Sequence, residues 1–204
     1  MPTEVADGVW DITCIEREGG GRIRAYLVED EVATLVDTGL SNTTERLFDG
    51  IASVGLDPER VVITHGDGDH VGGYDAVVDR YDPETYVPEQ TELDAEPDHR
   101  YGDGDVIGAF EAVHLPGHEP DNHALVDEAR GVAILGDALS GADQRGLPAG
   151  YFHLPPGYHS EDLSEAEASL EKLQVYDFDV GLVFHGSSVL ADARAVLDRY
   201  IYRP

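Results

Sequence analysis

One short segment constrains this chain more than any other, because four side chains that can bind a metal ion occur within six residues. These side chains are His65, Asp67, Asp69 and His70. They follow an apolar run over residues 61–64, typical of a buried strand, and glycines at 66 and 68 let the intervening backbone turn tightly. An acidic surface loop would account for the two aspartates but not for the two histidines. We therefore predict a metal site at the end of this strand.

Short apolar runs rich in β-branched residues alternate with amphipathic helical patterns along the chain. Strands are predicted over residues 23–28, 32–36, 61–64, 132–135 and 180–184. Helices are predicted over residues 43–54, 162–174 and 188–201, and turn-rich stretches over residues 88–105 and 140–161. The first helix has a start that resembles a capping box, with Asn42 and Glu45, and Ser164 and Glu167 are the predicted cap of the second. These patterns favour the α/β class, with helices covering the sheets, and a single domain over residues 1–204.

The segment from His65 to His70 resembles the H-x-H-x-D-H signature of the metallo-β-lactamase superfamily. Four further motifs occur in the order that this family shows. They are Leu35-Val36-Asp37-Thr38-Gly39, Leu115-Pro116-Gly117-His118, Ile134-Leu135-Gly136-Asp137 and Phe184-His185-Gly186. The resemblance spans nearly the whole chain and implies an αββα sandwich with a dinuclear metal site on one edge.

The resemblance also implies a role for each ligand. His65 and His118 would bind the first metal ion, and Asp137 would bridge the two ions. Asp69, His70 and His185 would bind the second ion, and Asp69 and Asp137 are the expected catalytic carboxylates. The implied cofactors are two divalent metal ions, with zinc as the first choice, because imidazole and carboxylate ligands suit zinc, iron and manganese.

Asp67 departs from the family pattern, because most members have the second histidine of the signature at this position. Its carboxylate either reaches the first metal ion and favours a harder ion such as iron or manganese, or falls short and weakens that site. Asp37 is a further expected participant, as a hydrogen-bond partner that orients the ligand loop.

Several other polar side chains have weaker claims on the site. His123, His153 and Tyr158, together with Tyr151 and His159, lie in segments predicted to be rich in turns, where members of this family build the substrate pocket. Each is a candidate for substrate contact, and an ordinary surface position is the competing interpretation. His99 and His114 have no motif around them, and we expect both to fill surface or core positions.

The resemblance favours a hydrolase in which a metal-bound hydroxide attacks an ester-like bond of a small molecule, such as a thioester or lactone. A glyoxalase-type thioesterase in the strict sense would carry a helical C-terminal extension, whereas 19 residues follow His185. A nuclease that acts on RNA or DNA is an alternative, although 48 residues from His70 to His118 leave no room for an inserted nucleic-acid-binding domain. An iron persulfide dioxygenase built on His65, His118 and Asp137 is a third possibility, and a metal-binding module inactivated at Asp67 is a fourth.

The charge balance is extreme, because 42 acidic residues face 13 basic ones and the net charge is −29, with Lys172 as the sole lysine. Such a surface repels itself unless salt screens it, so we expect the chain to come from a halophilic archaeon. The composition argues against nucleic acid as a partner. We expect a small-molecule substrate, no membrane partner and a cytoplasmic location, with the lone Cys14 as a small buried side chain.

Overall fold

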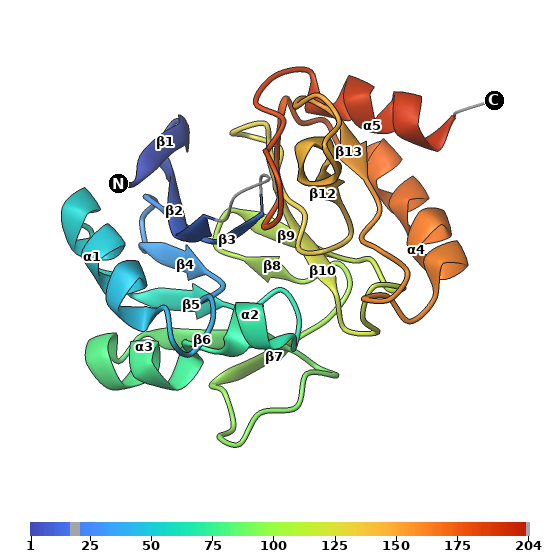
Figure 1. Cartoon of the computed structure of the whole chain (residues 1–204). Helices are drawn as coiled ribbons and strands as arrows, with labels where there is room; N and C mark the ends of the chain where they lie inside the picture. The colour runs from blue at the N-terminus through green and yellow to red at the C-terminus, as the bar shows by residue number, and fades with distance from the viewer. Residues whose placement is uncertain (17–20, 203–204) are drawn as a thin grey trace. The chain divides into compact units, whose positions relative to one another are not determined.

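The computed structural model describes residues 1–16 and 21–202, and the chain divides into two compact units (Figure 1). The first unit comprises residues 1–16 and 22–101 of the described chain, and the second comprises residue 21 and residues 102–202. Each unit is built on one large β-sheet, and each has helices packed on its sheet. No helix in either described range combines the length and apolarity needed to cross a bilayer.

The first unit contains a seven-stranded sheet whose spatial order is the order of the strands in the sequence. Its strands are β1 (Thr3–Ala6), β2 (Val9–Glu16), β3 (Arg22–Val28), β4 (Thr34–Val36), β5 (Arg60–Val62), β6 (Glu84–Pro88) and β7 (His99–Tyr101). Strands β1 to β4 are antiparallel neighbours, and β4 to β7 are parallel. Parallel neighbours need crossover connections, which are α1 (Thr44–Val54) between β4 and β5, and α2 (Gly68–Val71) with α3 (Tyr74–Tyr81) between β5 and β6.

Helices α1 and α3 lie along one side of this sheet (Figure 1), and their buried side chains share a core with it. That core consists of Ile12, Cys14, Ala25, Leu27, Leu35, Leu47, Ile51, Val61, Ile63, Tyr74, Val77 and Val87. The expected burial of Cys14 is thus confirmed. Helix α1 begins after Thr43 rather than after Asn42, so the predicted capping box is wrong. The Thr43 hydroxyl donates to the Leu40 carbonyl and does not cap the helix.

The second unit contains a five-stranded sheet in the order β14-β11-β10-β9-β8 and a two-stranded sheet of β12 and β13. The strands are β8 (Val106–Ile107), β9 (Phe110–His114), β10 (His123–Asp127), β11 (Val132–Ile134), β12 (Ser140–Gly141), β13 (Phe152–His153) and β14 (Val180–Leu182). Only β11 and β14 are parallel among the described strands of this unit. The stretch over residues 140–161, predicted to consist of turns, therefore also contains two short strands, just as residues 88–105 contain β7.

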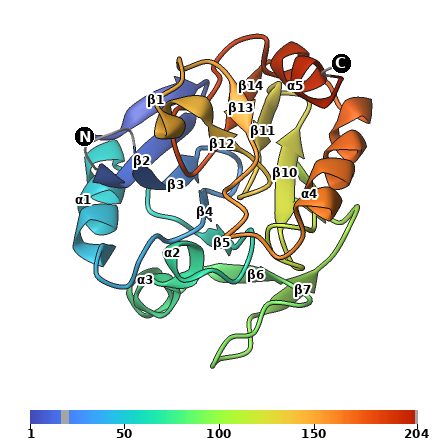
Figure 2. The same ribbon diagram turned by 45° about the vertical axis from the view of Figure 1, so that its right-hand side comes forward.

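The helices of the second unit are α4 (Leu163–Ser169), the 3₁₀ helices η1 (Ala142–Arg145) and η2 (Leu170–Val175), and α5 (Ala193–Ile201). Figure 2 shows α4 and α5 beside β10 and β11, where they cover a core that includes Leu135, Leu170 and Leu197. The predicted cap of α4 was wrong, because the Asp162 carboxylate accepts from the amides of Ser164 and Glu165.

The sequence predicted that the last helix starts at residue 188, but helix α5 starts at Ala193. The reason is a backbone pairing that the sequence pattern does not reveal. Val189 pairs with Gly181 through two hydrogen bonds, of 2.8 and 2.9 Å, which hold this part of the chain extended. The predicted strands are confirmed, with boundaries that differ by one or two residues.

Candidate metal centre

The predicted ligand loop in the first unit runs from the end of β5 through the single helical turn of α2. Close backbone packing fixes this turn. A Cβ atom at Gly72 would lie 2.3 Å from the Gly68 carbonyl oxygen and 2.6 Å from the Ser41 amide, and one at Gly73 would lie 2.5 Å from the Thr38 carbonyl oxygen. Only glycine fits at these two positions, so the small residues after His70 seat the loop against residues 38–41.

The Asp37 carboxylate organises this loop, as the sequence predicted. Asp37 is fully buried and has a φ of 59°, a left-handed conformation that aspartate tolerates better than most residues. Its Oδ1 accepts from the Thr64 amide at 2.7 Å, and its Oδ2 accepts from the Thr64 hydroxyl at 2.7 Å. The same Oδ2 lies 2.7 Å from Nδ1 of His70. One carboxylate therefore holds both the start and the end of the loop.

These hydrogen bonds select the histidine tautomer that suits a metal ion. His70 donates its Nδ1 proton to Asp37, so Nε2 carries the lone pair that a metal needs. His65 is arranged in the same way, because its Nδ1 lies 3.1 Å from the Thr64 hydroxyl oxygen, whose own proton goes to Asp37. Both rings are buried, with centroids 3.9 Å apart.

The donor atoms of this loop lie at distances that ligands of a common metal ion adopt. His65 Nε2 is 3.7 Å from Asp67 Oδ2, and donor atoms of Asp69 and His70 lie within 4.8 Å of each other. Two ligands on one tetrahedral zinc ion, with bonds of about 2.0–2.1 Å, stand about 3.3 Å apart. Asp67, whose side chain is 41% exposed, thus turns its carboxylate towards the His65 ring.

The second unit brings its three predicted ligands together around one carboxylate oxygen. Asp137 Oδ2 lies 3.0 Å from His185 Nε2 and 3.5 Å from His118 Nε2. Strands β11 and β14 are parallel, and their last residues, Ile134 and Leu182, pair with each other. Asp137 and His185 lie three positions after these two residues. The two ligands therefore emerge side by side, and the donors and their spacing fit divalent metal binding.

Neighbouring backbone groups hold these ligands in place. The Asn122 side chain donates to the Leu115 carbonyl at 3.1 Å and accepts from the Asp137 amide at 2.9 Å, so it joins two of the ligand segments. In the segment that leads to His118, Gly117 has a φ of 123°, and a Cβ atom there would lie 2.1 Å from the Ala166 amide nitrogen. Helix α4 thus packs directly against the residue before His118.

The candidates for substrate contact lie in varied surroundings. His123 and His153 were predicted to lie in turns, which was wrong, because they belong to β10 and β13. Both bond to backbone carbonyls, His123 to Asp121 at 2.7 Å and His153 to Leu154. Tyr158 is in a turn and is 81% exposed. Their contact with substrate stays a prediction.

His123 should make stability depend on pH. Burial lowers the pKa of His123 from 6.5 to about 4. The hydrogen bond to the Asp121 carbonyl raises this pKa, but its effect is smaller than that of burial. Because the unfolded chain binds the proton more tightly, His123 stabilises the fold above pH 6.5, and this contribution is lost as the pH falls towards 4. Between pH 7.5 and pH 5 the metal-free protein should lose about 2 kcal/mol more unfolding free energy than a His123→Asn variant. Urea unfolding at both pH values measures this difference, and equal losses would contradict it.

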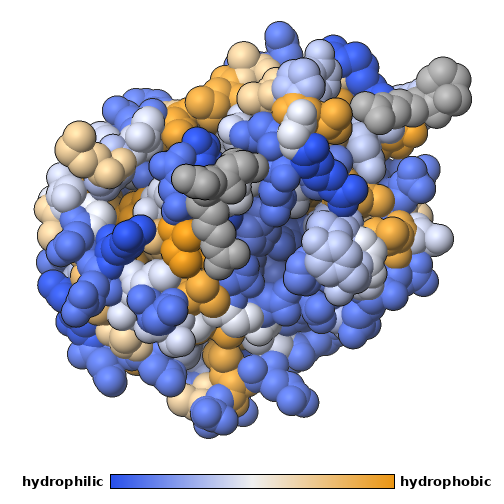
Figure 3. Space-filling model, viewed as in Figure 1, coloured by the Kyte–Doolittle hydropathy of each residue, from blue (hydrophilic) through white to orange (hydrophobic). Residues whose placement is uncertain are grey.

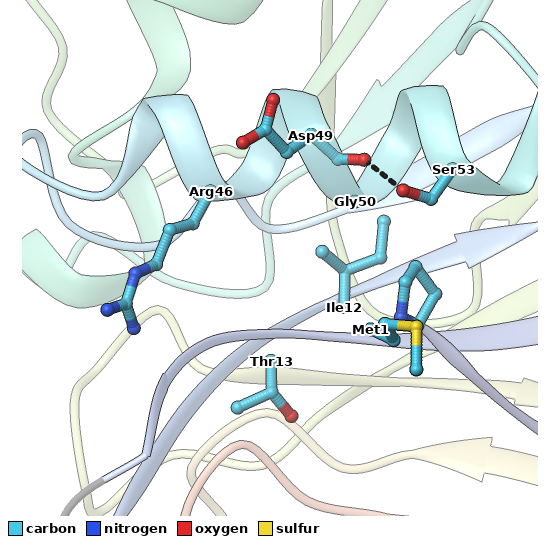
Figure 4. Close-up of a pocket in the computed structure, with 8 residues that line it drawn as sticks. Met1, Ile12, Thr13, Arg46, Asp49, Gly50 and Ser53 are labelled. Carbon is cyan, nitrogen blue, oxygen red and sulfur yellow. Dashed lines mark hydrogen bonds between the residues drawn. The ribbon is translucent and has the colours of Figure 1, made fainter.

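A pocket of about 330 Å³ lies elsewhere in the first unit, between β2 and α1 (Figure 4). Its walls are Met1, Pro2, Ile12, Thr13, Arg46, Asp49, Gly50 and Ser53. The Ser53 hydroxyl donates to the Asp49 carbonyl within the helix, at 2.6 Å. None of the predicted metal ligands lines this pocket, so we do not place the reaction there.

The sequence interpretation missed the residues that support the ligands, chiefly Thr64, Asn122, Asp143 and Ser187. Thr64 directly precedes a ligand, and a small hydroxyl residue in that position was the one available signal. The others lie far along the chain from their partners, as with Asp143 and Ser187, which are 44 residues apart.

The metallo-beta-lactamase superfamily model matches residues 19–186, so the chain belongs to this superfamily and is an enzyme of the metallo-hydrolase type. The predicted α/β class and fold are thereby confirmed. A solved structure, a metallo-beta-lactamase from Pontibacter korlensis, superposes with a TM-score of 0.78 over 98% of this chain and 96% of that one. The two sequences are 22% identical, so this likeness shows the fold alone.

Two relatives are similar in sequence. A hydroxyacylglutathione hydrolase of Francisella tularensis subsp. novicida (strain U112) is 28% identical over 82% of this chain and 68% of its own length. YobT of Bacillus subtilis (strain 168), an uncharacterized protein, is 24% identical over 57% of this chain, and the match spans 62% of its length.

Proposed function

We propose that the chain is a metal-dependent hydrolase that cleaves an ester-like bond of a small molecule, with a thioester as the first candidate. The observation that carries this proposal is the single Asp137 oxygen between two histidine Nε2 atoms, at 3.0 and 3.5 Å. A carboxylate in such a position suits a bridging ligand. The name of the Francisella relative, a hydroxyacylglutathione hydrolase, supports a thioester, and the residues 19–186 of the family match include all seven predicted ligands.

The ligand set that we propose is the one that the family resemblance implies. His65, Asp67 and His118 serve the first ion, Asp69, His70 and His185 serve the second, and Asp137 serves both. When bound, such ions lower the pKa of water and polarise a carbonyl group. The protein supplies the oriented imidazoles, with His70 fixed by Asp37, and the carboxylates of Asp69 and Asp137 as the catalytic pair.

A substrate panel tests the proposed function. Protein purified in high salt is analysed for metal and then assayed with thioesters, lactones, a β-lactam and RNA. We expect bound metal and the fastest turnover with a thioester or lactone. Turnover of RNA alone would favour a nuclease instead, and thiol-dependent oxygen uptake with iron would favour a persulfide dioxygenase. Protein without metal at any stoichiometry would contradict the proposal.

The identity of the metal should depend on Asp67. A carboxylate is a harder ligand than an imidazole, so the wild type should bind more iron or manganese than an Asp67→His variant after anaerobic reconstitution with equal zinc, iron and manganese. Elemental analysis of both proteins gives the metals and their stoichiometry. One ion in the wild type and two in the variant would contradict coordination by Asp67.

We also propose that the acidic surface is an adaptation to high salt inside the cell. The face seen in Figure 3 is mostly hydrophilic, in line with the net charge of −29. Screening of this charge should raise the melting temperature by about 10 °C or more between about 0.1 M and 3 M KCl. Calorimetry over this series measures the change, and a flat or falling series would contradict a halophilic source. The cytoplasmic location stays a prediction.

A further inference from the structure

A carboxylate clamp holds the loop that carries His185. Asp143, on the 3₁₀ helix η1, accepts two hydrogen bonds from one serine. Its Oδ1 accepts from the Ser187 amide and its Oδ2 from the Ser187 hydroxyl, both at 2.6 Å. The Gly141 amide donates to the carbonyl of His185 itself at 2.8 Å. Residues 141–143 therefore grip residues 185–187 at three points.

The clamp leaves no room for side chains between the two segments. A Cβ atom at Gly186 would lie 2.5 Å from the Gly141 carbonyl oxygen and 2.9 Å from Asp143 Oδ1, and one at Gly141 would lie 2.3 Å from the Ser187 amide. Gly186 also has a φ of 74°, which favours glycine. Backbone therefore packs on backbone, and the loop can shift only if the segment after Asp137 moves with it.

This arrangement joins two predicted ligands mechanically. Asp137 lies six residues before Asp143, on the segment that grips the His185 loop, and the two ligands face each other at 3.0 Å. We propose that Asp143 is a positioning residue, which fixes His185 beside Asp137 and so sets the affinity of the metal site. The inference rests on the proposed function. Asp143 places both carboxylate oxygens on Ser187, so we assign it a role that acts through the loop.

The chain contains a matched control for this clamp in its first unit. Asp98 Oδ2 accepts from the Thr85 amide at 3.0 Å and from the Thr85 hydroxyl at 2.9 Å. Thr85 pairs with Val61, the middle residue of β5, which lies four residues before His65. In both clamps an aspartate carboxylate accepts from the amide and the hydroxyl of one residue, although Asp98 uses Oδ2 for both bonds, and the Asp98 clamp holds no predicted ligand.

The test compares zinc affinity, measured on metal-free protein by competition with a chromophoric chelator, among wild type, Asp143→Ala, Ser187→Ala and Asp98→Ala. Asp143→Ala should weaken zinc binding about 10- to 100-fold and lower kcat with little change in KM. Ser187→Ala, which keeps the amide hydrogen bond, should weaken it about fivefold. Asp98→Ala should bind zinc as the wild type does. Urea unfolding of each variant measures its stability separately. If Asp143→Ala does not fold, Ser187→Ala tests the inference in its place.

Three results would overturn the inference. The first is a zinc affinity that is unchanged in Asp143→Ala and in Ser187→Ala. If the wild type binds zinc and hydrolyses its substrate, this result overturns the inference and leaves the proposed function intact. Asp98→Ala could lose as much affinity as Asp143→Ala, so that the effect reflects general stability. A wild type that binds no metal would overturn the proposed function and this inference with it.

Discussion

Replacing Asp137 with alanine is expected to abolish turnover and to release metal. The carboxylate lies between His118 and His185, so its removal takes away the ligand that we propose both metal ions share. Loss of several kcal/mol of transition-state stabilisation corresponds to a decrease in kcat of about a thousandfold or more. Kinetics on the best substrate and elemental analysis of the same sample measure both effects.

Asp127→Asn provides the control for this experiment. Asp127 is also buried in the second unit, but it binds Arg130 at the end of β10. This variant should lose some stability and keep both metal and activity. An Asp137→Ala protein that retained most of its metal and turnover would show that the ligand assignment is wrong.

Replacing Asp37 should have the largest effect on stability. In Asp37→Ala the amide and hydroxyl of Thr64 and Nδ1 of His70 all lose a buried charged acceptor, and alanine must adopt a φ of 59°. We expect the unfolding free energy of the metal-free protein to fall by at least about 3 kcal/mol. Urea unfolding in the presence of a chelator measures this loss.

Asp37→Asn separates the orientation of the ligand from stability. Asparagine tolerates the left-handed backbone and keeps an acceptor for the Thr64 amide. Its NH₂ group, however, donates towards His70 Nδ1, which moves the ring proton to Nε2, the atom that binds metal. Zinc affinity should therefore fall about 10- to 100-fold with only a small loss of stability. Wild-type affinity in this variant would contradict the tautomer that we assign.

The five strands that the sequence predicts, which are β3, β4, β5, β11 and β14, could be found because each is a short apolar run whose signal is local. Helix α3 has eight residues and two buried side chains, Tyr74 and Val77, so its periodicity is too brief to detect. The start of α5 was misplaced for a different reason. Val189 makes its hydrogen bonds with Gly181, and such a pairing depends on tertiary structure.

The candidate ligands could be predicted because they cluster at strand ends and resemble a family signature. Most of the residues that support them could not, since apart from Thr64 these residues bond to partners distant in sequence. Asp37 bonds to a residue 33 positions later and Asp143 to one 44 positions later. The exception is Asp37 itself, which lies in one of the recognised motifs.

The parallel pairing of β11 and β14 has a consequence for how such a chain can change during evolution. Val132 pairs with Val180, and the same offset of 48 residues separates Asp137 from His185. The pairing of β11 with β14 thus places both ligands at the same number of residues beyond the strand ends, whatever the length of the polypeptide that connects them. Residues 148–150, which are exposed between the Asp143 clamp and β13, can be lengthened, shortened or exchanged between lineages without displacing either ligand. A single-residue insertion between Ile134 and Asp137 would not be tolerated in this way, because it would move the Asp137 carboxylate away from His185.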